Sequence, residues 1–168
     1  MAKPAPKIDP LGLLQTLDRH RVSYILVGAL ARIAQGAEEM TYGVDIVPAM
    51  REENLRRLDT ALDELGARRA DGAELGSLQA GFPPEPVLEL ATERGELKIV
   101  PQPEGTRGFE DLRRAATREY LGRGVRTSIA SVGDLARMVS ALGREDDIPK
   151  LLAMRRIAEL ELTQGLEL

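Results

Sequence analysis

The stretch from residue 23 to residue 48 constrains the fold more than any other part of the chain. An apolar, β-branched run ends at Gly28, a helix-compatible segment follows, and a second strand-like run over 44–47 carries Asp45. A strand that turns through a glycine into a helix predicts an anion site, because the first helical N–H groups have no partner inside the helix. A carboxylate on the next strand can then hold a metal ion near the phosphate. The alternative is a purely structural turn beside a strand-edge aspartate.

Regular elements are predicted on both sides of this stretch. Asp9 and Pro10 open a helix that runs to about residue 19, as an N-cap followed by proline at the first helical position. Leucines at helical spacing predict an amphipathic helix over 51–67. Two short apolar runs, 87–90 and 97–100, flank a glycine-bearing turn and predict an antiparallel hairpin.

The second half of the chain is expected to combine loops, one more strand and helices. Glycine and proline over 71–86 indicate a loop that contains a short strand or turn. A polar segment over 109–121 is predicted to be helical, and 124–130 is predicted to be a strand. Two helices follow, the first capped by Ser131 and the second by Asp147 or its neighbour.

The order of these elements predicts the fold class α/β to α+β, a mixed β-sheet with packed helices. A chain of 168 residues is typical of one domain, which we place at 9–168. Its helical C-terminal part covers about 131–168, and residues 1–8 are expected to form a flexible N-terminal arm.

Composition excludes several kinds of site. The chain has no cysteine, so disulfides, zinc–thiolate sites and thiol nucleophiles are excluded. Its single histidine, His20, excludes multi-histidine metal sites and argues against a Ser-His-Asp triad. No apolar run approaches the roughly 20 residues of a membrane span, and the first ten residues lack a signal-peptide core. We therefore expect a cytoplasmic protein without membrane contact.

Charge gives no global indication of nucleic-acid binding. The net charge is −4, with 23 basic and 27 acidic residues, so any RNA contact needs a local patch. One local cluster is basic, and it is either a solvated face or a patch for an RNA acceptor. Its members are Arg113, Arg114, Arg118, Arg123 and Arg126.

Four segments together resemble the minimal nucleotidyltransferases of the AbiEii type. These are Val-Gly-x-Leu-Ala-Arg at 27–32, Thr-x-x-x-Asp-Ile-Val-Pro at 41–48, Gly-Glu-Leu-Lys-Ile-Val-Pro at 95–101 and Ser-Val-Gly-Asp-Leu-Ala-Arg-Met at 131–138. The group includes nucleotidyltransferase toxins of toxin–antitoxin systems, a branch of the polymerase-beta-like superfamily. The resemblance covers nearly the whole chain from residue 17 to residue 156.

The resemblance implies a nucleotidyltransferase fold with C-terminal helices. It also implies transfer of a nucleoside monophosphate from a nucleoside triphosphate to a hydroxyl of RNA or protein, and a cognate antitoxin as partner. In such enzymes two Mg²⁺ ions stabilise the attacking and leaving oxygens, and carboxylates hold these hard cations. The family motif has a glycine loop for the phosphates, two aspartates one residue apart on a strand, and a third aspartate on a later strand.

This chain departs from that motif at several positions. Gly28 matches the first loop glycine, and Ala29 stands at the second loop position. Asp45 matches the second aspartate and is the metal ligand if any metal binds. Gly43 and Lys98 occupy the places of the other two aspartates. Transfer is therefore expected to be impaired or lost, and the alternative function is a non-catalytic relative that binds a nucleotide or a partner protein.

The remaining charged residues suggest a site without metal. We expect a direct ion pair between Lys98 and Asp45 that leaves a pocket without metal; a lysine that reaches from the strand edge to water is the alternative. A structural or dimerising domain with a remnant cleft is the third interpretation of the chain. The identity of the nucleotide and the oligomeric state are not specified by any motif. The remaining predicted nucleotide contacts are Arg32, Thr41, Arg144 and Lys150.

Overall fold

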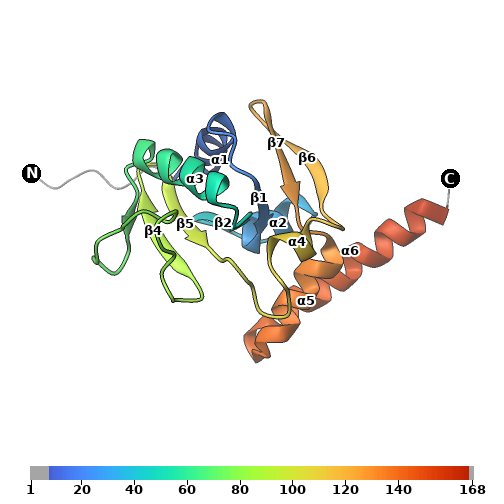
Figure 1. The fold of residues 1–168 in the computed structure, drawn as a ribbon. Coiled ribbons are helices and arrows are strands. Elements are labelled where there is room, and N and C mark those ends of the chain that lie inside the picture. Colours follow the sequence, from blue (N-terminus) through green and yellow to red (C-terminus); the bar gives the residue numbers. More distant parts are fainter. Residues whose placement is uncertain (1–7, 167–168) are drawn as a thin grey trace, which may run out of the picture.

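The structure is a computed structural model that describes residues 8–166. Within this range a seven-stranded mixed sheet is packed with six α-helices (Figure 1). The predicted class, a mixed β-sheet with packed helices, is confirmed. The expected N-terminal arm over 1–8 lies outside the described residues except for Ile8.

The bounds of the elements follow the chain. The helices are α1 (Pro10–Arg19), α2 (Gly28–Ala34), α3 (Glu52–Glu64), α4 (Phe109–Leu112), α5 (Val132–Leu142) and α6 (Ile148–Leu166), with a 3-10 helix η1 (Glu145–Asp147) before α6. The strands are β1 (Tyr24–Val27), β2 (Gly43–Pro48), β3 (Arg68–Arg69), β4 (Leu88–Thr92), β5 (Gly95–Ile99), β6 (Thr117–Gly122) and β7 (Val125–Ile129).

The two strands of the 23–48 stretch lie next to each other inside the sheet. The strand order is β3-β4-β5-β2-β1-β7-β6. β1 is antiparallel to β2, while β7 runs parallel to β1 and β5 runs parallel to β2. All four residues of β1 are buried, as expected of a strand covered on both faces. The predicted hairpin is confirmed as the antiparallel pair β4 and β5.

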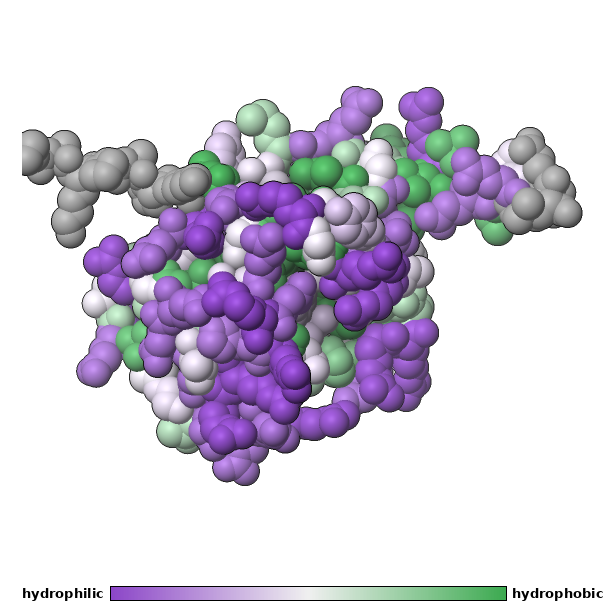
Figure 2. All heavy atoms as spheres, turned by 90° about the horizontal axis from the view of Figure 1, so that it is seen from above, coloured by the Kyte–Doolittle hydropathy of each residue, from purple (hydrophilic) through white to green (hydrophobic). Residues whose placement is uncertain are grey.

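Helices cover the sheet in two groups. Leu13, Leu14 and Leu17 of α1 are fully buried, and α1 packs on α3, whose Leu58 is also fully buried. α2 contacts β1, β2 and α5, and α5 packs along α6 (Figure 1). Hydrophilic side chains cover most of the face seen from above, with hydrophobic ones showing between them (Figure 2). No helix among residues 8–166 has both the length and the apolar character needed to cross a bilayer.

The prediction for 109–121 was wrong in part. The segment is helical only over α4, and its end forms β6, which pairs with β7. Most residues of β6 are exposed, so the strand has no alternation of apolar and polar residues by which to identify it.

The prediction for 71–86 is confirmed, since this segment is a loop with a turn at 78–80. The Asp59 carboxylate holds the loop by accepting hydrogen bonds from Ser77 Oγ and two backbone N–H groups.

The ends of α5 follow the predicted signals, whereas the start of α6 does not. Ser131 Oγ accepts a hydrogen bond from the Asp134 N–H at 3.0 Å, and Gly143 ends α5 in the left-handed conformation. The Asp147 carboxylate does not cap α6. It instead accepts hydrogen bonds from the side chains of Arg144 and Lys150.

Asn54 joins the start of β1 to the end of β2. Its side chain is buried, and its Oδ1 accepts a hydrogen bond from the Ser23 N–H at 2.7 Å. Its Nδ2 donates to the carbonyl oxygens of Ser23 and Ala49 at 2.9 and 2.7 Å. The Ser23 carbonyl also accepts a backbone hydrogen bond from the Ala49 N–H at 3.0 Å, whereas the Ser23 N–H and the Ala49 carbonyl are bonded by the Asn54 side chain.

We predict that Asn54→Ala lowers the free energy of unfolding by about 2 kcal/mol or more, because it removes three hydrogen bonds, among them the one to the carbonyl of the buried Ala49. Urea unfolding measures the loss. The control is Arg56→Ala on the exposed face of α3, which should change stability by about 0.5 kcal/mol or less. Equal losses in both variants would contradict the assigned role of Asn54.

Candidate functional site

A cleft of about 520 Å³ lies where β1 ends and α2 begins. Its volume is within the range of small-molecule sites. Every residue for which the sequence analysis predicted a role in catalysis or nucleotide binding lines this cleft. These residues are Gly28, Ala29, Arg32, Thr41, Gly43, Asp45, Lys98, Arg144 and Lys150.

Sheet topology explains how residues far apart in sequence meet here. β2 is antiparallel to β1, so the start of β2 lies beside the end of β1, with Asp45 paired to Val27. β5 runs parallel to β2 and pairs Lys98 with Asp45. Paired residues on neighbouring strands point to the same face. Asp45 and Lys98 therefore share one face, and the buried Ile46 and Ile99 lie on the other.

Position 28 requires a glycine for two reasons, the left-handed backbone conformation and the close contact with Asp45. The φ of Gly28 is +73°, in the left-handed region that other residues rarely adopt. A Cβ at this position would lie 2.3 Å from Asp45 Oδ2. The glycine therefore lets the turn into α2 approach the Asp45 carboxylate closely.

Asp45 is a partly buried carboxylate. Burial raises its pKa, and the nearby charges of Lys98 and Arg32 act in the opposite direction. Glu96 and Glu89 add to the rise. None of the hydrogen bonds among residues 8–166 ends on the Asp45 carboxylate. Its oxygens therefore remain free to accept a proton or a hydrogen bond from a ligand.

The expected direct ion pair between Lys98 and Asp45 does not form. The two residues occupy paired positions on β5 and β2, yet no oxygen of Asp45 lies within 4.0 Å of the Lys98 ammonium. Lys98 forms no ion pair with any other carboxylate of residues 8–166 either. The Lys98 ammonium thus has no direct ion-pair partner among these residues, although the Asp45 carboxylate is near enough to interact with its charge.

The ligand set for two magnesium ions is not present. A Cβ at Gly43 would lie 2.2 Å from the Glu96 carbonyl oxygen, so β2 and β5 are too close there for a side chain. Within residues 8–166, no three carboxylate or imidazole side chains form a group that could hold a metal ion. A hard cation needs several oxygen ligands, and the positive charge of Lys98 opposes its binding.

Two of the predicted contacts have local structural roles. The buried Arg32 guanidinium donates to both oxygens of Glu39 at 2.6 and 3.0 Å. Thr41 Oγ1 donates to the Gly43 carbonyl oxygen at 2.9 Å and shapes the turn before β2. Both side chains line the cleft, but their polar groups are already engaged with protein groups.

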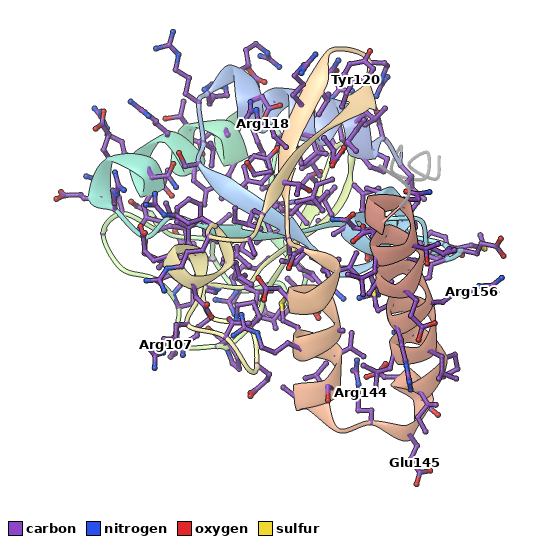
Figure 3. All side chains as sticks on the ribbon, turned by 90° about the vertical axis from the view of Figure 1, so that its right-hand side faces the viewer. Arg107, Arg118, Tyr120, Arg144, Glu145 and Arg156 are labelled. Carbon is purple, nitrogen blue, oxygen red and sulfur yellow. The ribbon has the colours of Figure 1, made fainter. Side chains whose placement is uncertain are left out.

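Arg144 and Lys150 reach the cleft from the turn between α5 and α6 (Figure 3 labels Arg144). Both donate to the buried Asp147 carboxylate, at 2.6 and 3.2 Å. Their positive charges, that of Arg144 foremost, hold the pKa of Asp147 below its usual value. One buried carboxylate thus positions two cations, each of which has further donors for a ligand.

Several lining residues were missed by the sequence analysis. Glu96 stands two residues before Lys98 on β5, so strand alternation could have placed it on the same face. The others, Glu104 among them, come mainly from loops and helix ends, which no pattern in the sequence assigns to the cleft. Val139, on the apolar stripe of α5, is buried in the cleft wall. The exposed apolar side chains of the lining are Met40, Tyr42, Val87 and Leu142.

We predict that Gly28→Ala lowers the free energy of unfolding by about 2–4 kcal/mol, because left-handed strain adds to overlap with Asp45. Gly143→Ala is the matched control, since Gly143 is also left-handed but no atom lies near its missing Cβ. Gly143→Ala should lower the free energy of unfolding only by the strain of the left-handed backbone, about 1 kcal/mol. Denaturant unfolding of both variants tests this, and equal losses would show that Gly28 does not contact Asp45 closely.

We also predict that Asp45→Asn stabilises the fold near neutral pH. A carboxyl whose pKa is raised by folding favours the protonated form, so its ionisation destabilises the folded state. The advantage of the variant should therefore shrink as pH falls through the folded pKa, and end below the unfolded value of about 3.9. Unfolding curves from pH 3 to 7 measure this, with Asp63→Asn on α3 as the control for losing one charge. A pH-independent difference would contradict burial of the Asp45 charge.

Comparison of the chain with models of known protein families and with curated proteins found no match. The resemblance to AbiEii-type nucleotidyltransferases therefore stays a prediction from the motifs. The function proposed below rests on the residues that line the cleft.

Proposed function

We propose that the cleft binds a nucleoside triphosphate, and that the chain is a nucleotidyltransferase relative in which metal-dependent transfer is impaired or lost. The observation that carries this proposal is the free positive charge of Lys98. It lies in the same cleft as the close turn at Gly28, without an ion pair to any of residues 8–166. A phosphate group is the natural counter-charge for such an ammonium.

The rest of the lining suits the other parts of a nucleotide. Arg144 and Lys150 add two cations to the lining, and these can bind further phosphate groups of a triphosphate chain. The exposed side chains of Tyr42 and Met40 offer apolar surface for a base. Small-molecule sites commonly combine apolar walls with a few polar groups in this way.

The missing carboxylates argue against transfer by the usual mechanism. Nucleotidyl transfer on two metal ions needs oxygen ligands on both strands, and this cleft offers Asp45 alone at the motif positions. Lys98 would repel a metal ion there, and Gly43 has no room for a side chain.

The second candidate is an active enzyme that transfers a nucleotide to an RNA or protein hydroxyl. The specific observation in its favour is Asp45, which faces the phosphate-side turn at Gly28 and has no hydrogen bond within residues 8–166. A cytoplasmic location stays a prediction from the apolar pattern of the sequence, and an antitoxin partner stays a prediction from the motif resemblance.

We predict that at least one of ATP, GTP, CTP and UTP binds in the presence of EDTA, as measured by isothermal titration calorimetry. Lys98→Gln should weaken this binding by about tenfold or more, because hydrogen bonds to charged groups contribute about 1.5–3 kcal/mol. Arg68→Gln is the control, since Arg68 is exposed, forms no ion pair with residues 8–166 and does not line the cleft. If no nucleotide binds, or if both variants bind equally, the proposal is wrong.

The two candidates are separated by incubation with magnesium, labelled nucleoside triphosphates and total RNA. We expect no transfer of label to RNA or to protein. Transfer that Asp45→Asn abolishes would establish the active enzyme and overturn the proposal that catalysis is impaired or lost.

A further inference from the structure

A second pocket, of about 820 Å³, is lined by five arginines, and we call it the arginine pocket. It lies at the start of β1, beside β7, α4 and the segment between α4 and β6. Four of the five belong to the basic cluster that the sequence indicated, and the fold adds Arg21; the remaining member of that cluster, Arg123, pairs with Asp9 and does not line the pocket. The five arginines of the pocket are Arg21, Arg113, Arg114, Arg118 and Arg126.

The arginine pocket is separate from the candidate cleft. The cleft lies at the end of β1, where Gly28 begins α2, and no residue lines both. Figure 3 shows Arg118 on the β6–β7 hairpin, at the opposite end of the molecule from Arg144. A ligand in the pocket would therefore not be the nucleotide that we propose for the cleft.

Positive charge in the pocket is largely uncompensated. Arg113 pairs with Glu110 at 3.1 Å, but the other four arginines have no carboxylate within 4.0 Å among residues 8–166. Most described arginines do form ion pairs, so this concentration is local. The chain as a whole carries a net charge of −4.

The one acidic side chain in the lining forms no ion pair with these arginines. Asp18 accepts a hydrogen bond from the Tyr24 hydroxyl at 2.9 Å, and Tyr24 also bonds to Thr127 at 2.6 Å. Burial raises the pKa of Asp18, while its hydrogen bond from Tyr24 and the charge of Arg118 act in the opposite direction. A single carboxyl group cannot balance five guanidinium charges, so the pocket stays positive.

Such an arrangement matches a multiply charged anion. Guanidinium groups bind phosphate oxygens through two parallel hydrogen bonds, and several of them can share the oxygens of neighbouring phosphates. Hydroxyls of Ser23 and Ser128 in the lining add neutral donors. Because like charges repel, an anion that lies among the four unpaired arginines stabilises the folded state.

Concavity favours a small anion over a polynucleotide. The arginines face one pocket and are not spread along a track, and Glu119 and Glu110 stand beside them in the chain. An RNA strand needs cations spaced along several nucleotides and aromatic platforms for its bases, and this chain has few aromatic residues.

We propose that the arginine pocket binds a small anion with two or three linked phosphate groups. This inference goes beyond the function proposed for the cleft and does not depend on it.

The test uses tripolyphosphate with EDTA, followed by calorimetry and thermal unfolding of the full chain. We expect binding and a higher unfolding temperature, beyond the effect of sodium sulfate at equal ionic strength. The double variant Arg118→Gln/Arg126→Gln should weaken binding by about tenfold or more. Both side chains are exposed, so the variant should fold, which circular dichroism verifies. If it does not fold, Arg118→Lys keeps the charge but loses the guanidinium fork, and it should weaken binding less.

Matched controls isolate the pocket. Arg68→Gln/Arg156→Gln removes the same charge from exposed arginines outside both sites, and Figure 3 shows Arg156 pointing away from α6. This control should bind tripolyphosphate as the unchanged chain does. Lys98→Gln removes a cation of the cleft, so it should remove only binding in the cleft and leave the binding in the arginine pocket unchanged. Equal weakening in the two double variants, or loss of binding only in Lys98→Gln, would overturn the proposal. So would binding of a single-stranded RNA oligonucleotide through Arg118 and Arg126 without binding of tripolyphosphate.

Discussion

The antiparallel pairing of β1 with β2 is the interaction on which the rest of the structure depends. It places Val27 opposite Asp45, and so brings the turn at Gly28 against the Asp45 carboxylate. Because β5 pairs with β2 and β7 with β1, the same pairing also sets where Lys98 and Arg126 lie. Both pockets are therefore consequences of one central register, with the cleft at the end of β1 and the arginine pocket at its start. A slip of one residue would turn Asp45 toward the apolar core.

The cations that line the two pockets are of two kinds. Some form an ion pair with a carboxylate of the protein, and the others have no such partner. Asp147 holds Arg144 and Lys150, and Glu39 holds Arg32, so these cations are fixed before any ligand arrives. Lys98 and the arginine pocket differ, because no carboxylate of residues 8–166 forms a direct ion pair with Lys98 or with four of the five arginines. Uncompensated cations in concave surfaces attract anions more strongly than their number suggests, because the protein walls focus the field. The two pockets thus follow one electrostatic principle, although the net charge of the chain is negative.

Much of the fold could be predicted from local patterns. The helix at 10–19, the amphipathic α3 and the β4–β5 hairpin follow from capping signals, leucine spacing and a glycine turn. β6 could not be predicted, because its residues are mostly exposed and its conformation comes from pairing with β7. The three hydrogen bonds of Asn54 were equally hidden, since an asparagine inside a helix pattern normally faces water. Local sequence reports burial and turns well, but not a partner that is distant in the chain.

The sequence by itself indicated part of the cleft: the strand that turns through a glycine and the next strand with its aspartate predicted Gly28 and Asp45, and the motif resemblance added Lys98. Only the tertiary structure decided what those residues do. It showed that Lys98 and Asp45 share a face without pairing, that Arg32 and Thr41 are engaged elsewhere, and that no side chain fits at Gly43. The physical reason is the distance along the chain over which each interaction acts. Strand alternation and turn chemistry act over a few neighbouring residues, whereas ion pairing and steric room depend on distances of a few ångströms between segments that folding brings together.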